Sequence, residues 1–262
     1  MIYFLFTASR DSRFKSSILN AIVCAGIVLF ANLGLSNAHA EMVIESTRVI
    51  YPEAQRDVSF RITNASKDKP AFVQLWLDDG NSAAAPEDVI TPFNLTPPVA
   101  RLKAEASQVV RLIYSGDPLP ADRESVFWFN MLEVPPKSKE ENRLSFAIRT
   151  RIKVFFRPKA LKGDPIQSMD KVNWKIVKKE DQLFLEGQNP SPFHMSFFSF
   201  SLGTGSQFEP FIDGGMVPPM GTATFLIPPD RKTPTTLNKV KVEFINDYGG
   251  AVTKEFAVTF AP

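Results

Sequence analysis

From residue 43 onward, short apolar runs alternate with segments rich in Gly, Pro, Asn, Asp and Ser. Within several runs every second residue is apolar, which is the spacing of a β-strand with one buried face. The first group of predicted strands covers residues 43–51, 58–62, 71–77, 109–114, 125–134 and 144–156. The second group covers residues 174–177, 183–186, 195–202, 222–227, 240–244 and 256–260. Apart from a turn near residues 166–170, no useful length of chain has a helical period, so the pattern predicts an all-β protein.

The alternation stops after Pro158. Residues 159–165 contain Gly and Pro and no strand pattern, so we interpret them as a linker. The linker would separate residues 41–158 from residues 166–262. Roughly seven strands in little more than a hundred residues is typical of an immunoglobulin-like sandwich. The predicted fold is therefore two immunoglobulin-like β-sandwich domains joined by a short linker.

The first forty residues follow a different pattern. Three basic residues, Arg10, Arg13 and Lys15, precede an apolar run at residues 18–35 and the tripeptide Ala-His-Ala at 38–40. This order is typical of a secretory signal peptide, so we predict that residues 1–40 are cleaved off. A retained membrane anchor is the alternative, because the run approaches the length that spans a bilayer. Two asparagines interrupt that run and favour cleavage.

Cleavage changes the charge of the protein. The full chain has 30 basic and 28 acidic residues, and removing three basic and one acidic residue leaves 27 of each. A mature chain without net charge offers no broad electrostatic surface for nucleic acid. Its only cysteine, Cys24, lies in the predicted signal peptide. The exported domains would therefore be held together by packing, without a disulfide.

Few residues of the mature chain suit catalysis. It has one histidine, His194, and no cysteine, which excludes the usual His/Cys zinc sites and Cys–His pairs. A Ser–His–Asp arrangement would depend on His194 alone, which we interpret as a structural residue of a surface or turn. No nucleophile-elbow, P-loop or dinucleotide motif occurs, and no motif favours a paired-carboxylate hydrolase. We predict no enzyme activity, no catalytic residues, no metal and no cofactor.

Two central segments mix charged residues into apolar strands. They are residues 119–136, LPADRESVFWFNMLEVPP, and residues 151–158, RIKVFFRP. A charge in a buried or half-buried strand must be paired or must meet a ligand. Together with INDYGG at residues 245–250, these segments resemble the signature of periplasmic pilus (fimbrial) chaperones. The connection at residues 137–141 is short, which is similar to the short-loop branch of that family.

The resemblance implies a function. Such a protein would be a periplasmic chaperone that binds and stabilises fimbrial subunits by donor-strand complementation and delivers them to an outer-membrane usher. It would need no cofactor, bind no nucleic acid and have no integral membrane span after signal cleavage. Two alternatives stay open: a secreted two-domain immunoglobulin-like adhesion or binding module, and a periplasmic hydrolase built on β-sandwiches.

Leu144, Phe146 and Ile148 alternate with smaller or polar residues and therefore share one face of a strand. Periodicity alone favours a strand that buries this face in its own core. The resemblance instead implies a donor strand, whose alternating side chains enter a groove of the subunit while its backbone completes the subunit's sheet.

The resemblance also assigns roles to charged residues. It implies that Arg48 and Lys153 anchor the subunit's C-terminal carboxylate, a group that an arginine can bind through both oxygens while a lysine adds a point charge. From the residues alone, each cation could equally reach the solvent at a strand end. A second set links the two domains by charge in the family and comprises Glu124, Arg157 and Asp247.

Overall fold

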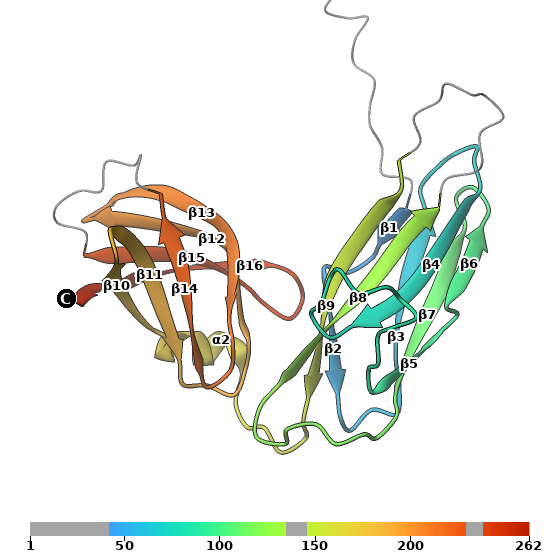
Figure 1. Cartoon of the computed structure of the whole chain (residues 1–262), viewed down its shortest axis with the longest axis horizontal. Coiled ribbons are helices and arrows are strands. Elements are labelled where there is room, and N and C mark those ends of the chain that lie inside the picture. The colour runs from blue at the N-terminus through green and yellow to red at the C-terminus, as the bar shows by residue number, and fades with distance from the viewer. Residues whose placement is uncertain (1–41, 135–145, 229–237, 262) are drawn as a thin grey trace, which may run out of the picture. The chain divides into compact units, whose positions relative to one another are not determined.

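The computed structural model describes residues 42–134, 146–228 and 238–261, and it is built almost entirely of β-strands (Figure 1). The predicted signal peptide and its cleavage site lie outside the described residues. In the described part of the chain, four sheets enclose two separate clusters of buried apolar residues. The chain therefore forms two β-sandwich domains, as the sequence predicted.

The first domain packs a four-stranded sheet against a five-stranded sheet. The order of the first sheet is β1 (Met42–Ile44), β3 (Val58–Asn64), β7 (Ser107–Tyr114) and β5 (Phe93–Thr96). The order of the second is β2 (Arg48–Pro52), β9 (Ile148–Arg157), β8 (Ser125–Val134), β4 (Ala71–Asp78) and β6 (Val99–Leu102). In β8, Phe127, Phe129 and Met131 point into the core, as the period-two pattern requires.

The second domain also consists of two sheets. One contains β14 (Gly221–Ile227), β11 (Gln182–Asn189), β10 (Asn173–Lys179) and β17 (Thr259–Ala261), in that order. The other contains β13 (Gln207–Val217), β12 (Met195–Thr204), β15 (Lys239–Ile245) and β16 (Ala251–Ala257). Their shared core is aromatic: the Trp174 ring meets Phe197 and Phe200 edge-on, at centroid distances of 5.3 and 5.5 Å.

One short helical segment follows the predicted linker. The α2 helix (Pro165–Ser168) begins after Asp164, whose carboxylate accepts hydrogen bonds from the backbone N–H groups of Ile166 and Gln167. A single 3₁₀ turn, η1 (Met169–Lys171), continues it. The turn expected near residues 166–170 is therefore present.

The sequence pattern missed three strands, β5, β6 and β13, and it predicted one strand at 256–260 where the structure has the end of β16 and the start of β17. The strands β5 and β6 are only four residues long, and β13 contains a proline and two glycines. The strand β16 forms one edge of its sheet and alternates only between exposed and half-exposed residues, so it lacks the apolar period. The run predicted at 43–51 is also divided, because its two halves, β1 and β2, pair in different sheets.

Candidate functional site

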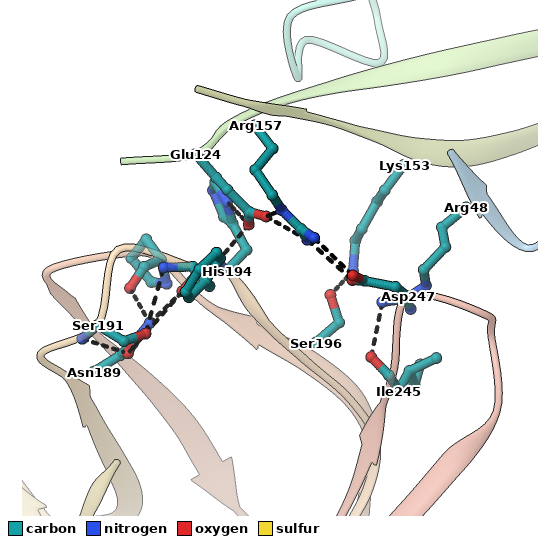
Figure 2. Close-up of polar contacts among 12 residues, drawn as sticks. Arg48, Glu124, Lys153, Arg157, Asn189, Ser191, His194, Ser196, Ile245 and Asp247 are labelled. Carbon is teal, nitrogen blue, oxygen red and sulfur yellow. Dashed lines mark hydrogen bonds and ion pairs between the residues drawn. The ribbon is translucent and has the colours of Figure 1, made fainter. Parts of the chain in front are cut away.

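Arg48 and Lys153 lie side by side on neighbouring strands. Strand β2 runs parallel to β9, and the register pairs Arg48 directly with Lys153. Figure 2 shows the two side chains descending from these strands toward the second domain. Two positions 105 residues apart in the sequence are thus brought together by one parallel strand pair.

The guanidinium of Arg48 is buried and only partly satisfied. Its Nη1 donates to the carbonyl oxygen of Ile245 at 2.9 Å, while Nε has no hydrogen-bond partner. The group also lies over the Phe155 ring, 5.7 Å from the centroid. Burial lowers the pKa of Arg48, and the negative charges of Asp247 and Glu124 partly offset this decrease. An unpaired buried donor of this kind favours an additional acceptor.

Lys153 is held in a similar environment. Its Nζ lies 3.3 Å from Oγ of Ser196, a residue of β12 in the second domain. Burial and, to a lesser extent, the neighbouring charge of Arg48 lower the pKa of Lys153 to about 8. Among the described residues, no carboxylate forms an ion pair with either cation. Two adjacent and partly desolvated cations create a positive potential that favours the binding of a small anion.

Beside this pair, one edge of β9 is open. Strand β2 pairs only with residues 153–157 of β9, so within the described chain residues 148–152 have β8 as their only neighbouring strand. Two of the three predicted donor residues lie next to this edge and are exposed: Phe146 is 72% exposed and Ile148 is 50% exposed. Leu144 lies outside the described residues. The open edge presents unpaired backbone groups and apolar side chains together.

The predicted interdomain charges form one cluster (Figure 2). Arg157 donates through Nε to Oε1 of Glu124 at 2.8 Å, and through Nη1 and Nη2 to the two oxygens of Asp247 at 2.7 and 3.0 Å. Glu124 is almost fully buried, whereas about a third of the Asp247 side chain is exposed. Burial by itself would lower the pKa of Arg157, but the two carboxylates raise it. One cation therefore links the two domains.

The turn that carries Asp247 also touches the first domain. Asn246 closes the turn, because its side-chain oxygen accepts from the backbone N–H groups of Tyr248 and Gly250. Gly249 has φ +82°, and a Cβ added there would lie 2.4 Å from Oγ1 of Thr47. Only glycine suits both the backbone conformation and the close approach.

Two contacts of this site were not foreseen. His194 is buried, not a surface residue: its backbone N–H donates to Glu124 Oε2 at 2.8 Å, and its Nδ1 lies 3.4 Å from the same oxygen. Ser196, the partner of Lys153, carried no signal in the sequence. A small recess of about 10 Å³ brings several of these groups together and is lined by Arg48, Glu124, Phe155, Arg157, Pro165, His194, Phe244, Ile245 and Asp247.

Within the described ranges, no group of three or more His, Cys, Asp or Glu residues is placed to hold a metal ion. None of the helices in that part of the chain has the length and apolar character needed to cross a membrane.

Comparison with protein families identifies the chain. Residues 41–162 match the model described as pili and flagellar-assembly chaperone, PapD N-terminal domain, and residues 167–256 match the pili assembly chaperone PapD, C-terminal domain. The chain belongs to the pilus-assembly chaperone family. This is a family of assembly chaperones, not enzymes, which confirms the prediction that the chain has no enzyme activity.

Individual family members support the same assignment. The probable fimbrial chaperone YadV of Escherichia coli K12 is 40% identical over 225 residues, which cover 83% of this chain and 89% of YadV. The crystal structure of the CupB2 chaperone of Pseudomonas aeruginosa aligns with a TM-score of 0.69 at 36% identity, covering 82% of this chain and all of CupB2. The SafB chaperone of Salmonella enterica, solved in complex with the SafA pilin, gives 0.70 at 25% identity, covering 85% of this chain and 98% of that one.

Proposed function

We propose that this pilus-assembly chaperone acts in the periplasm, where it binds fimbrial subunits by donor-strand complementation and passes them to an outer-membrane usher. The pairing of Arg48 with Lys153 beside the open edge of β9 carries the proposal. An anion-binding pair at the end of an unpaired strand edge fits a partner strand that ends in a carboxylate. Membership of the family and the SafB–SafA complex support the same partner class.

In the proposed complex, the last strand of a subunit pairs with residues 148–152 of β9. Backbone hydrogen bonds along the edge supply affinity, and Phe146 and Ile148 enter the subunit's groove. The subunit's terminal carboxylate binds between Arg48 and Lys153, where it compensates two cations that the fold has already partly desolvated. Burying the two exposed apolar side chains adds hydrophobic stabilisation.

The remaining charges have a structural role in this proposal. The cluster of Glu124, Arg157 and Asp247 fixes the second domain against the first, so that Ser196 and Ile245 remain beside the two anchoring cations. The domain boundaries proposed from the sequence, 41–158 and 166–262, are supported by the end of β9 at Arg157 and the start of α2 at Pro165.

The carboxylate anchor can be tested with a synthetic peptide of the C-terminal strand of a fimbrial subunit from the same organism. The peptide is titrated with a free and with an amidated C-terminus against the wild type and Lys153→Ala. Lys153→Ala should weaken binding of the free acid by roughly 2–5 kcal/mol, as expected when one member of a desolvated charge pair is removed.

The decisive measurement combines the two changes, the amidated peptide and the Lys153→Ala variant. If Lys153 contacts the carboxylate, amidation should weaken the wild type strongly and the variant only slightly, because both changes remove the same interaction. Equal losses on amidation in both proteins would show that Lys153 does not bind the carboxylate, and the proposed anchor would then be wrong.

A further inference from the structure

A fully buried carboxylate lies on the outward face of the five-stranded sheet. In β4, Val73, Leu75 and Leu77 belong to the core of the first domain, so Asp78 and Trp76 belong to the opposite face. Asp78 is nevertheless 0% exposed. A buried carboxylate needs partners for its charge, and these partners come from the strand that we propose to be the donor.

Two arginines of β9 reach Asp78 across the intervening strand β8. Arg151 donates to both oxygens of Asp78, through Nε at 2.9 Å and through Nη2 in a short contact, and Arg149 Nη2 lies 3.4 Å from Oδ2. Asn130 of β8 donates to the same Oδ2 at 2.8 Å, and the backbone N–H of Gly80 donates to Oδ1 at 2.8 Å. Burial by itself would raise the pKa of Asp78, but these hydrogen bonds outweigh it and hold the pKa below its ordinary value.

Both guanidinium groups are also fixed by aromatic rings. Arg149 lies over the Trp76 ring, 4.9 Å from its centroid, and Arg151 lies over the Trp128 ring at 4.6 Å. Arg149 makes further hydrogen bonds, from Nε and Nη2 to the side-chain oxygen of Asn130 at 3.0 and 2.8 Å. Each arginine therefore has a stacking partner and several acceptors, which restricts its rotation.

We propose that Asp78, Asn130, Arg149 and Arg151, here called the Asp78 staple, are positioning residues for subunit capture. The two arginines belong to the part of β9 that has β8 as its only strand neighbour in the described chain. An edge segment of this kind would otherwise fray. The staple adds side-chain links across β8 to β4 and keeps the segment extended before the subunit arrives.

The staple also orients the donor side chains. Alternate residues of a strand face opposite sides, so Arg149 and Arg151 on one face fix Ile148 on the other. If only a fraction of the free molecules has this segment in place, the apparent affinity for the subunit equals the intrinsic affinity multiplied by that fraction. The staple therefore acts on the speed of capture, while the anchor at Lys153 acts on the bound complex. This inference rests on the proposed function.

The test uses the full mature protein with Asp78→Asn and Arg149→Lys, the second of which keeps the charge but loses the planar fork. Glu45→Gln is the matched control, because it removes an exposed ion pair with Arg61 on the other sheet of the same domain. Hydrogen exchange is followed at the amides of residues 148–152, and thermal melting reports the folded fraction. A fimbrial subunit from the same organism, diluted from denaturant, is the probe for the association and dissociation rates.

At a temperature where all proteins are folded, both staple variants should exchange these amides about tenfold or more faster than the wild type and bind the subunit more slowly by a similar factor. Their dissociation rates should stay within about twofold, since the subunit's strand then holds the segment. The control should match the wild type in every measurement. If Asp78→Asn does not fold, Arg149→Lys alone decides the test.

Unchanged exchange, or faster exchange with a wild-type association rate, would overturn the inference. A lower melting temperature with wild-type rates would assign the staple to stability alone and would equally overturn it. These failures differ from failure of the proposed function, in which the wild type itself would not capture the subunit.

Discussion

Arg157 and Asp247 are 90 residues apart in the chain, yet their side chains form a paired contact of two hydrogen bonds at 2.7 and 3.0 Å. One residue ends the last strand of the first domain, and the other lies in the turn between the last two long strands of the second. Because Arg157 also contacts Glu124, a single guanidinium compensates two carboxylates. The two partners differ in burial, so their removal should have different consequences.

Replacing Arg157 should destabilise the protein more than replacing Asp247. Arg157→Gln leaves Glu124, which is almost fully buried, without its cation, and we expect a loss of about 3 kcal/mol. Asp247 is about a third exposed and water can replace part of its contact, so Asp247→Asn should cost about 1 kcal/mol or less. Urea unfolding of both variants measures this order. If Asp247→Asn cost more stability than Arg157→Gln, the burial of Glu124 would not be the dominant factor in this cluster.

Carboxylate binding should weaken at alkaline pH because of Lys153, whose pKa is lowered to about 8 from 10.5. Between these two values the unfolded chain keeps a proton that the folded free protein has lost, so this lysine makes the free protein more stable as pH rises. Binding has the opposite dependence, since the carboxylate attracts only the protonated amine. The affinity for a free-acid peptide should be constant below about pH 7.5 and should fall above pH 8.

Two controls isolate that effect. In the Lys153→Met variant the side chain at position 153 does not titrate, so the affinity of this variant for the free-acid peptide should vary much less between pH 7 and 9.5. The amidated peptide should likewise show a flatter dependence with the wild type. Isothermal titration across this range provides the measurement, and an identical pH profile for wild type and Lys153→Met would exclude Lys153 as the titrating group.

Phe146→Glu should separate binding from folding. The side chain is 72% exposed, so a charge at this position stays hydrated and the melting temperature should change by no more than a few degrees. Capture of a subunit should be lost, because the glutamate would have to enter an apolar groove unpaired. Melting curves and co-purification with a subunit from a periplasmic extract test both parts. A collapsed melting curve would instead indicate a core residue.

Gly187→Ala should destabilise the second domain. Gly187 of β11 pairs with Trp174 of β10, and an added Cβ would lie 2.6 Å from Cζ3 of that ring. The ring is buried and packed on two phenylalanines, so it cannot move freely, and we expect a loss of about 1–3 kcal/mol. Adding Trp174→Phe should make the combined loss smaller than the sum of the two single losses. Strict additivity in urea unfolding would argue against the clash.

Export can be tested directly at the N-terminus. If residues 1–40 are a signal peptide, protein isolated from the periplasm should begin at Glu41. N-terminal sequencing of the periplasmic and membrane fractions gives the result. An intact N-terminus in the membrane fraction would support the retained anchor and contradict the proposed location.

The sequence by itself determined the fold class and the positions of most strands along the chain. Period-two runs such as residues 125–134 record directly which side chains face a core, because successive residues of a strand point to opposite sides. Lys153, Glu124 and Arg157 stood out because charges in otherwise apolar segments need partners, whereas Arg48 and Asp247 were singled out by the resemblance to a known family. The resemblance to a known family assigned them to an anchoring pair and an interdomain set, and the structure places the members of each group close together.

Only the tertiary structure decided which of these groups meet. The parallel pairing of β2 with β9 sets Arg48 beside Lys153, and no local pattern encodes the register of strands so far apart. The staple was missed for the same reason: Asp78 reads as a turn residue, and its burial arises from arginines more than seventy residues later in the chain. Ser196 and His194 gain their contacts only when the second domain meets the first. Sequence period reports which face a side chain takes, whereas long-range pairing decides what that face contacts.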